Sequence, residues 1–519
     1  MPVVNITING KKCSVEAGKT ILAAARENKF NIPTLCHFEG LEARANCRIC
    51  VVEVEGMRTL QPACATIVSE GMVIYTNSEK VTAARKATLE LILAHHAVDC
   101  HHCLRIGSSD EQSLDPKFCE MCFWCDCERD GFCELQTLAR QYHVDVLPYV
   151  QHEKDYEIDS SLGSIIRNPN KCIKCRRCVD VCGEIQTVHN LSLANRGRDV
   201  MVVPELGLPM ADSSCVRCGH CVDVCPTGAL HIKEHKDEIL YRTHAYNDRT
   251  IAMLSEDVID EMEELYKLKK SSISSGKIVA ALRKIGFDIV ISDAKAKNMA
   301  SLQAAEIIKK NVAGRPLLLT NSHAVMNFVE KYFPQMKEKI HRYDSAQAAF
   351  AKLAQVYKGD SPLYTVNITN VKEAGTEAHE TGNVDYTMNA RELYRTFIRT
   401  GGAPAGRTPK PFDALDAGDM KYPELLGEKE WNLSKEPEVV EITVNGAVLS
   451  CAIAHNLGQV RALLEGDWQK YNGEKRQNLK KVAHDIVPKP DRKNNHPGHP
   501  FWRDAPDMRE RGNTREINL

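Results

Sequence analysis

The distribution of cysteine is the feature that most constrains this chain. Twenty of its 21 cysteines lie within the first 225 of 519 residues, and the remaining one is Cys451. Nineteen of those twenty fall in spacings that are typical of iron–sulfur ligands. A disulfide scaffold is disfavoured because such scaffolds are small secreted chains, and residues 1–6 lack the basic and apolar regions of a signal peptide. We therefore predict a cytoplasmic protein whose front half carries electrons and whose thiolates bind metal.

Length, charge and hydropathy limit the remaining classes. A chain of 519 residues is long for one core and predicts three or more units. With 67 Lys+Arg against 69 Asp+Glu the net charge is close to zero, which favours neither nucleic-acid binding nor adhesion to a membrane. No apolar run approaches the ~18 residues of a membrane span. We expect no nucleic-acid partner and no membrane partner.

The first 79 residues predict a small sheet with a four-cysteine loop. Alternating apolar residues precede Asn9-Gly10, a strong hairpin signal, and a helical stretch follows over about residues 19–28. A long loop, a tight pair and a distant fourth thiolate then suit one [2Fe–2S] cluster, although four cysteines could also bind zinc. Cys13 lies on a strand and is expected to be a buried apolar residue. The predicted ligands are Cys36, Cys47, Cys50 and Cys64.

This segment resembles the β-grasp ferredoxin domain of complex I large subunits and [FeFe] hydrogenases. In the next segment, His96-x3-Cys100-x2-Cys103 resembles the opening of the [4Fe–4S] site that those families bind with one histidine and three cysteines, and Cys133 resembles its close. The resemblance implies that this cluster is bound by His96, Cys100, Cys103 and Cys133.

The middle segment departs from the family pattern. Twenty-nine residues separate Cys103 from Cys133, where the family has five, and they bring four more cysteines. We predict that these four form a further site for a [4Fe–4S] cluster or for zinc. Because Cys127-x5-Cys133 also matches the family spacing, the alternative assigns Cys127 to the histidine-ligated cluster. The four inserted residues are Cys119, Cys122, Cys125 and Cys127.

Two matching cysteine runs follow, and they form an internal duplication. Each reads C-x2-C-x2-C-x3-C, the bacterial two-cluster pattern in which the fourth cysteine of each run binds the other cluster. The predicted ligands are Cys172, Cys175, Cys178 and Cys225 for one [4Fe–4S] cluster, and Cys215, Cys218, Cys221 and Cys182 for the other. The first run is flanked by cations that could raise its potential, face a partner or form a solvated basic rim. These cations are Lys171, Lys174, Arg176 and Arg177.

The thiol-poor half predicts an α/β domain. Residues 276–300 give a periodic helix that ends at Gly286 and then a buried strand at 289–291. Further strands at 316–320 and 363–368 alternate with helices, which indicates an α/β architecture. A hairpin is expected over 438–454, followed by a helix over 457–465. The polar tail is expected to wrap over its own domain or a partner.

The order of these segments resembles the large subunit of [FeFe] hydrogenases over roughly residues 1–500. The stretches GKIVAALRKIGFD and VDYTMNARELYR look like helices that flank that family's active site. Where the family has Thr-Ser-Cys-Cys-Pro-Gly-Trp, this chain has residues 320–326, with Ser322 at the proton-relay cysteine and His323 at the cluster-binding cysteine. Where the family has Met-Pro-Cys, the chain ends on Val371. Residues 487–490 and Lys493 align with the third motif.

The resemblance implies that all four thiolate ligands of the hydrogenase H-cluster are replaced. We expect no H-cluster and no hydrogen chemistry. Two alternatives stay open: His323 could bind another metal, and Lys489 and Lys493 could fill the cavity with their charge.

The segments together predict a multidomain chain of α/β and α+β character. The domains are a β-grasp [2Fe–2S] domain over 1–79, a histidine-ligated [4Fe–4S] domain with a cysteine-rich insertion over 80–150, a bacterial-type two-cluster ferredoxin domain over 151–240, a degenerate hydrogenase-like α/β domain over 241–483 and an extended tail over 484–519.

The resemblance further implies an iron–sulfur relay subunit of a flavin-dependent NAD(P)H/ferredoxin oxidoreductase, similar to the linking subunit of electron-bifurcating transhydrogenases. The implied partners are a flavin- and NADH-binding subunit, a thioredoxin-like [2Fe–2S] subunit, a further flavoprotein subunit and ferredoxin. No Gly-x-Gly-x-x-Gly follows a strand, so we expect no nucleotide binding by this chain itself. As an electron relay, the chain is expected to have no substrate site of its own. The alternatives are a relay subunit of an NAD-dependent formate dehydrogenase, an enzyme with a different cofactor in the H-cluster cavity, and a non-catalytic assembly or redox-sensing protein.

Overall fold

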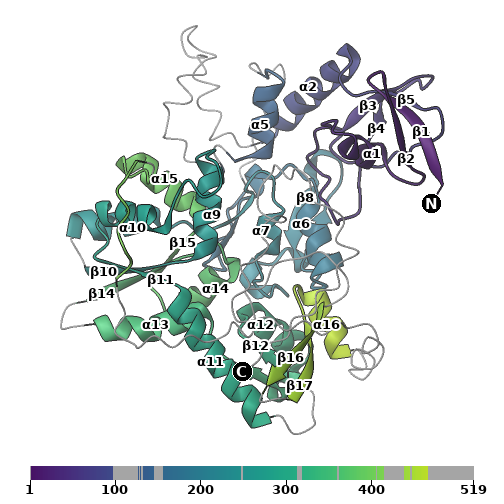
Figure 1. Ribbon diagram of the computed structural model, residues 1–519. Coiled ribbons are helices and arrows are strands. Elements are labelled where there is room, and N and C mark those ends of the chain that lie inside the picture. Colours follow the sequence, from purple (N-terminus) through teal and green to yellow (C-terminus); the bar gives the residue numbers. More distant parts are fainter. Residues whose placement is uncertain are drawn as a thin grey trace.

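The computed structural model describes most of the chain up to residue 465 (Figure 1). The described residues are 2–96, 127, 129, 132–144, 156–246, 249–311, 318–358, 362–404, 406–413, 438–444 and 447–465. Cys100, Cys103, Cys119, Cys122, Cys125, the third hydrogenase-type motif and the tail lie outside them. None of the helices in these ranges combines the length and apolar character needed to cross a bilayer.

The N-terminal unit is a five-stranded sheet with one helix across it (Figure 1). Its order is β2-β1-β5-β3-β4, and β1 pairs antiparallel with β2 and parallel with β5. The hairpin turns at Asn9 and Gly10, which both have the positive φ that a tight turn of this kind requires. The elements are β1 (Val3–Ile8), β2 (Lys11–Glu16), α1 (Ile21–Glu27), β3 (Val51–Val54), β4 (Gln61–Pro62) and β5 (Val73–Tyr75).

Two helices connect this unit to the rest of the chain. Helix α2 (Glu79–Leu93) and helix α5 (Glu134–Gln141) share a small core to which Leu89, Leu93 and Leu135 contribute. The buried Arg85 adds polar contacts, because its guanidinium donates to the Val51 carbonyl oxygen and to the Tyr142 hydroxyl.

The duplicated cysteine runs fold as a duplicated backbone. Lys174 and Arg217, at matching places in the two runs, have φ of 58° and 61°, and Arg176 and Gly219 have φ of 72° and 78°. A short helix follows each of the latter residues, and β6 pairs antiparallel with β9 to close the unit. The elements are β6 (Ile165–Arg167), α6 (Arg177–Asp180), the π-helical turn η3 (Val181–Ile185), β7 (Leu191–Ala194), β8 (Met201–Pro204), α7 (His220–Asp223) and β9 (Leu230–Ile232).

The C-terminal domain is built on a four-stranded parallel sheet of order β11-β10-β14-β15. The central strand β10 is buried over nearly its whole length, as both-face coverage by helices requires. Its elements to β14 are α8 (Lys236–Leu240), η7 (Tyr241–Tyr246), β10 (Arg249–Leu254), α9 (Glu256–Leu265), α10 (Ser275–Lys284), β11 (Ile289–Ser292), α11 (Ala294–Asn311), β12 (Leu318–Thr320), α12 (His323–Tyr332), β13 (Ile340–Arg342), α13 (Ala346–Tyr357) and β14 (Leu363–Ile368). It continues with α14 (Lys372–Thr381), β15 (Tyr386–Met388), α15 (Ala390–Thr400), β16 (Glu438–Val444), β17 (Ala447–Ile453) and α16 (Leu457–Glu465).

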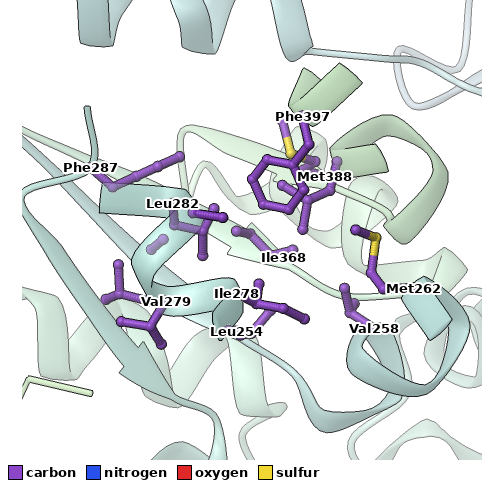
Figure 2. Close-up of a cluster of buried hydrophobic side chains, with 14 of the residues drawn as sticks. Leu254, Val258, Met262, Ile278, Val279, Leu282, Phe287, Ile368, Met388 and Phe397 are labelled. Carbon is purple, nitrogen blue, oxygen red and sulfur yellow. The ribbon is translucent and has the colours of Figure 1, made fainter. Parts of the chain in front are cut away.

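Two apolar cores cover the two faces of this sheet. On one face, Leu282 of α10 and Phe397 of α15 pack with Ile368 and Met388 from the strands (Figure 2). On the other face, residues of α11 and α13 pack against β10 and β11. The α/β architecture expected from the alternating strands and helices is therefore present.

The first core gives a direct test of stability. Phe397 is fully buried, so Phe397→Ala removes a large apolar side chain and leaves a cavity. We expect a loss of about 3–5 kcal/mol in the stability of this domain. The thermal unfolding midpoint should fall clearly, whereas Val356→Ala, at a position that is 78% exposed, should leave it nearly unchanged. Equal midpoints for the two variants would contradict the assigned core.

Candidate metal centres

The four cysteines of the N-terminal unit lie together beside the sheet. Strands β3 and β4 fix two of them, because the Ala63 amide donates to the Cys50 carbonyl oxygen at 3.1 Å and Cys64 follows directly. The Cys47 amide donates to the Cys36 sulfur at 3.5 Å. Hydrogen bonding from the Cys47 thiol lowers the pKa of Cys36 to about 6, and the Cys36 charge in turn acts on Cys50 and Cys64.

Cys13 of strand β2 is buried in the hydrophobic core with Ile6 and Val15, a core to which Cys50 and Cys64 also contribute.

The ferredoxin repeat brings its eight cysteines into two groups, and each group takes one residue from the other run. Burial raises the pKa of Cys172 to about 11, and the charge of Cys225 adds to that shift. Cys225 also acts on Cys175 and Cys178.

The second group has the same arrangement. Burial raises the pKa of Cys215 to about 11, and the charge of Cys182 adds to that shift. Cys182 also acts on Cys218 and Cys221. The fourth cysteine of each run therefore lies with the first three of the other run.

The chemistry of these donor sets fits [4Fe–4S] clusters. The thiols of each group act on one another electrostatically, and burial opposes their ionisation, so that bound iron is the charge that would stabilise the thiolates. Backbone amides already donate to sulfur: Lys174 to Cys172 and Arg217 to Cys215, both at 3.4 Å. Such bonds tune iron–sulfur potentials. Bound clusters would supply one-electron redox chemistry at these sites.

The middle segment is described only in part. Cys133 caps helix α5, and burial raises its pKa to about 12 with a contribution from the charge of Cys127. These two sulfurs therefore lie near each other, as required by the alternative that assigns Cys127 to the histidine-ligated cluster. His96 is buried at the end of α2, three residues after Leu93, which packs in the same core as Cys133.

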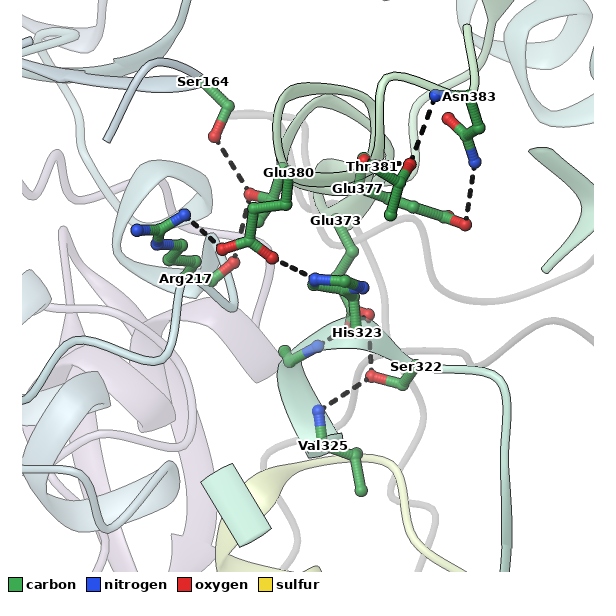
Figure 3. A network of polar contacts seen from close by, with 12 residues as sticks. Ser164, Arg217, Ser322, His323, Val325, Glu373, Glu377, Glu380, Thr381 and Asn383 are labelled. Atoms are coloured by element: carbon green, nitrogen blue, oxygen red, sulfur yellow. Dashed lines mark hydrogen bonds and ion pairs between the residues drawn. The ribbon is translucent and has the colours of Figure 1, made fainter. Parts of the chain in front are cut away.

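The hydrogenase-type motifs meet at two helix N-termini. Ser322 caps α12 by accepting from the Val325 amide at 3.2 Å, and its hydroxyl donates to a Glu373 carboxylate oxygen at 2.6 Å (Figure 3). Glu373 lies in the first turn of α14, which begins directly after Val371. The structure thus places the first and second motifs side by side, with a carboxylate between them.

His323 is engaged in an ion-paired network that reaches the ferredoxin repeat. Its Nε2 contacts one oxygen of Glu380, and Arg217 contacts the other (Figure 3). Arg342 donates to His323 Nδ1 at 3.1 Å, which assigns the proton of a neutral ring to Nε2. With a side chain that is 11% exposed, His323 is a partly buried histidine that already has polar partners.

The cavity beside Val371 is small. Its volume is about 20 Å³, and its lining includes Thr369, Lys372, Asn389 and Glu392. That is room for about one water molecule.

Comparisons with known proteins agree with this arrangement. Residues 2–79 match the 2Fe-2S iron-sulfur cluster binding domain, residues 171–229 the 4Fe-4S dicluster domain, and residues 248–475 the iron-only hydrogenase large subunit, C-terminal domain. The chain is 34% identical over 442 residues to the NADP-reducing hydrogenase subunit HndD of Solidesulfovibrio fructosivorans, covering 80% of this chain and 71% of the relative. This chain belongs to the iron-only hydrogenase large-subunit family.

Two further relatives match a smaller share of this chain and of their own length. Iron hydrogenase 1 of Clostridium pasteurianum is 28% identical over 68% of this chain and 58% of its own length. The mitochondrial NADH-ubiquinone oxidoreductase 78 kDa subunit of Candida albicans is 30% identical over 38% of this chain and 25% of its own length. The chain therefore shares sequence both with hydrogenases and with a subunit of an NADH-oxidising complex.

Several residues that shape these sites belong to no motif that can be recognised in the sequence. A solvated basic rim around the first ferredoxin run is wrong for Lys171 and Arg177, which are both only 3% exposed. Glu373 and Glu380 occupy the polar region between the hydrogenase-type motifs, and their roles depend on which helices the fold brings together.

The buried carboxyl group of Glu392 should make the stability of the folded protein depend on pH. Burial, with the nearby charge of Glu234, raises its pKa from 4.5 to about 8. Between these values the unfolded chain has released the proton and the folded chain has kept it, so stability falls as pH rises. Glu392→Gln should therefore gain stability relative to the unmodified protein from pH 5 to pH 8, by about 1 kcal/mol per pH unit.

Thermal unfolding midpoints at four pH values measure that difference. Gln keeps an acceptor for the His235 amide, which donates to this side chain. The exposed Glu338→Gln serves as the control and should show no such slope. A difference for Glu392→Gln that does not change with pH would refute the buried neutral carboxyl.

Proposed function

We propose that this chain relays electrons through iron–sulfur clusters in a flavin-dependent, electron-bifurcating NAD(P)H/ferredoxin oxidoreductase, and that it has no hydrogenase activity of its own. The observation that carries the proposal is the contrast between its two halves. Cysteine groups converge in the N-terminal half, while a small cavity and ion-paired side chains occupy the place of the first two hydrogenase-type motifs.

The relay assignment rests on the donor sets. We assign the [2Fe–2S] cluster to Cys36, Cys47, Cys50 and Cys64, and the two ferredoxin clusters to the groups that include Cys225 and Cys182. Clusters of plant-type ferredoxin character lie near −400 mV, which suits exchange with NAD(P)H and ferredoxin. In the middle segment, the proximity of Cys127 to Cys133 favours the partition that gives Cys127 to the histidine-ligated cluster with His96.

The proposal that no H-cluster is bound rests on the motif region. Ser322 and His323 already have partners in Glu373 and Glu380, and Val371 offers no donor atom. The cavity beside Val371 has a volume of about 20 Å³, room for about one water molecule, which disfavours a multinuclear metal group at that point. An enzyme with a different cofactor at this place is disfavoured for the same reasons.

The proposed partner subunits are inferred from the relatives of this chain. The name of the HndD relative describes it as a subunit of an NADP-reducing hydrogenase. We propose that this chain receives electrons from a flavin- and NADH-binding subunit and a thioredoxin-like [2Fe–2S] subunit, and passes them to a further flavoprotein or ferredoxin. A formate dehydrogenase complex is the second candidate, because it could use the same relay.

The assembled complex tests this function. NADH or NADPH should reduce the clusters of this chain, followed by loss of their visible absorbance, and formate should not. Cys178→Ser removes one proposed ligand, so it should interrupt ferredoxin reduction while the flavin subunit still reduces an artificial acceptor. Hydrogen evolution after exposure to the H-cluster maturation machinery would overturn the proposal, and reduction by formate would favour the second candidate.

The metal content of the purified chain tests the cluster number. One [2Fe–2S] and four [4Fe–4S] clusters require about 18 irons, whereas a zinc ion in the inserted site gives about 14 irons and one zinc. We expect about 18 by metal analysis. A count of about 14 irons without zinc would contradict a fifth metal site.

A further inference from the structure

One buried guanidinium lies where three of the proposed cluster sites meet. Arg177 follows Arg176 in the first ferredoxin run, between Cys175 and Cys178, and is only 3% exposed. Its Nη1 and Nη2 donate to the two carboxylate oxygens of Glu134 at 2.7 and 2.9 Å, a bidentate pair. Glu134 directly follows Cys133. The Arg177–Glu134 pair therefore connects the ferredoxin repeat to the proposed site of the histidine-ligated cluster.

The same guanidinium also reaches the [2Fe–2S] unit and the second ferredoxin run. Nη2 donates to the His37 carbonyl oxygen at 3.0 Å, next to Cys36, and the guanidinium lies 5.4 Å from the centre of the Phe38 ring. Nη1 also approaches the Val224 carbonyl oxygen at 3.5 Å, next to Cys225. One side chain thus contacts the neighbours of ligands from three sites.

The contacts of Arg177 place its charge at the first ferredoxin group. Arg177 stands between Cys175 and Cys178 in the chain, and its Nη1 reaches the carbonyl oxygen of Val224, the neighbour of Cys225. Its electrostatic effect is therefore concentrated on the cluster proposed for Cys172, Cys175, Cys178 and Cys225.

A positive charge stabilises the reduced form of a nearby cluster, because reduction adds negative charge, and the effect is larger in a buried site than in water. Glu134 offsets part of that charge. The Nε–H of Arg177 is buried and lacks a hydrogen-bond partner among the described residues. Glu134 therefore pairs with the two Nη atoms and leaves this third donor of the guanidinium unused by them.

We propose that Arg177 is a positioning residue that joins three cluster sites and that its buried charge raises the reduction potential of the cluster bound by Cys172, Cys175, Cys178 and Cys225. The inference rests on the proposed function in one respect, the presence of a cluster at those cysteines. The charge of Arg177 makes this cluster the more easily reduced of the two in the ferredoxin repeat. It is therefore the cluster that accepts electrons where the three sites meet.

Redox titration of the full chain, followed by EPR, tests the inference. Glu134→Gln keeps the size of the side chain and leaves the Arg177 charge uncompensated. At a fixed applied potential the reduced-to-oxidised ratio of the first ferredoxin cluster should rise about tenfold, which is 59 mV for a one-electron couple. Arg177→Gln should shift the ratio in the opposite direction. The second ferredoxin cluster should move less in both variants.

The neighbouring arginine provides a matched control. Arg176 has the same charge and lies in the same loop, but its side chain is 32% exposed and faces Asp180. Arg176→Gln should leave all potentials nearly unchanged because water screens its charge. The iron content of each variant shows whether its clusters are retained, and Glu134→Gln decides alone if Arg177→Gln loses them.

Two results would overturn the inference: an unchanged potential in Glu134→Gln, or shifts of the same sign in both variants, as a general disturbance of packing would produce. Failure of the proposed function is distinguishable from either result. In that case the unmodified chain would show no [4Fe–4S] signal at all.

Discussion

The burial of cysteine sulfur is the constraint on which the rest of this structure depends. In the ferredoxin repeat, removal from water opposes ionisation of the thiols, so a full set of thiolates is stable only beside iron or other positive charge. On the proposed assignment, the exchange of Cys182 and Cys225 between the two runs means that neither run supplies all four ligands of a cluster. Pairing of β6 with β9 then closes the two halves into one unit. Metal binding and folding of this region are therefore coupled.

The same constraint, the removal of charge from water, applies to the buried Arg177 of the first ferredoxin run. A guanidinium as deeply buried as that of Arg177 is costly unless it is paired, and Glu134 supplies the pair with ideal bidentate geometry. The carbonyl oxygens of His37 and Val224 accept further bonds from it. These contacts join three units whose separate cores are small, and they fix the relative positions of the proposed clusters. Electrostatic tuning and domain assembly thus depend on one residue.

Local pattern was sufficient to predict much of the fold. The Asn9-Gly10 hairpin, the helix that ends before Gly286 and the alternation of strands and helices all depend on short-range backbone preferences. The spacing within each run predicts that its first three sulfurs lie together, because each C-x2-C-x2-C stretch is a local structure, whereas the exchange of the fourth cysteine was expected from the bacterial two-cluster pattern. Lys171 and Arg177 were not predictable in this way, since a charged residue beside a cluster loop is exposed or buried according to what packs against it from distant segments. Glu134 and His37 lie 43 and 140 residues away from Arg177.

The region of the hydrogenase-type motifs retains a structural role. Helix α12, which carries Ser322 and His323, packs through Phe328 and Val329 against Val216 of the second ferredoxin run. Its polar end is held by Glu380, which also contacts Arg217 between Cys215 and Cys218. Two carboxylates, those of Glu373 and Glu380, therefore tie this helix to α14 and to the loop of a proposed cluster. Because Arg217 lies between Cys215 and Cys218, the same contacts help to position that loop.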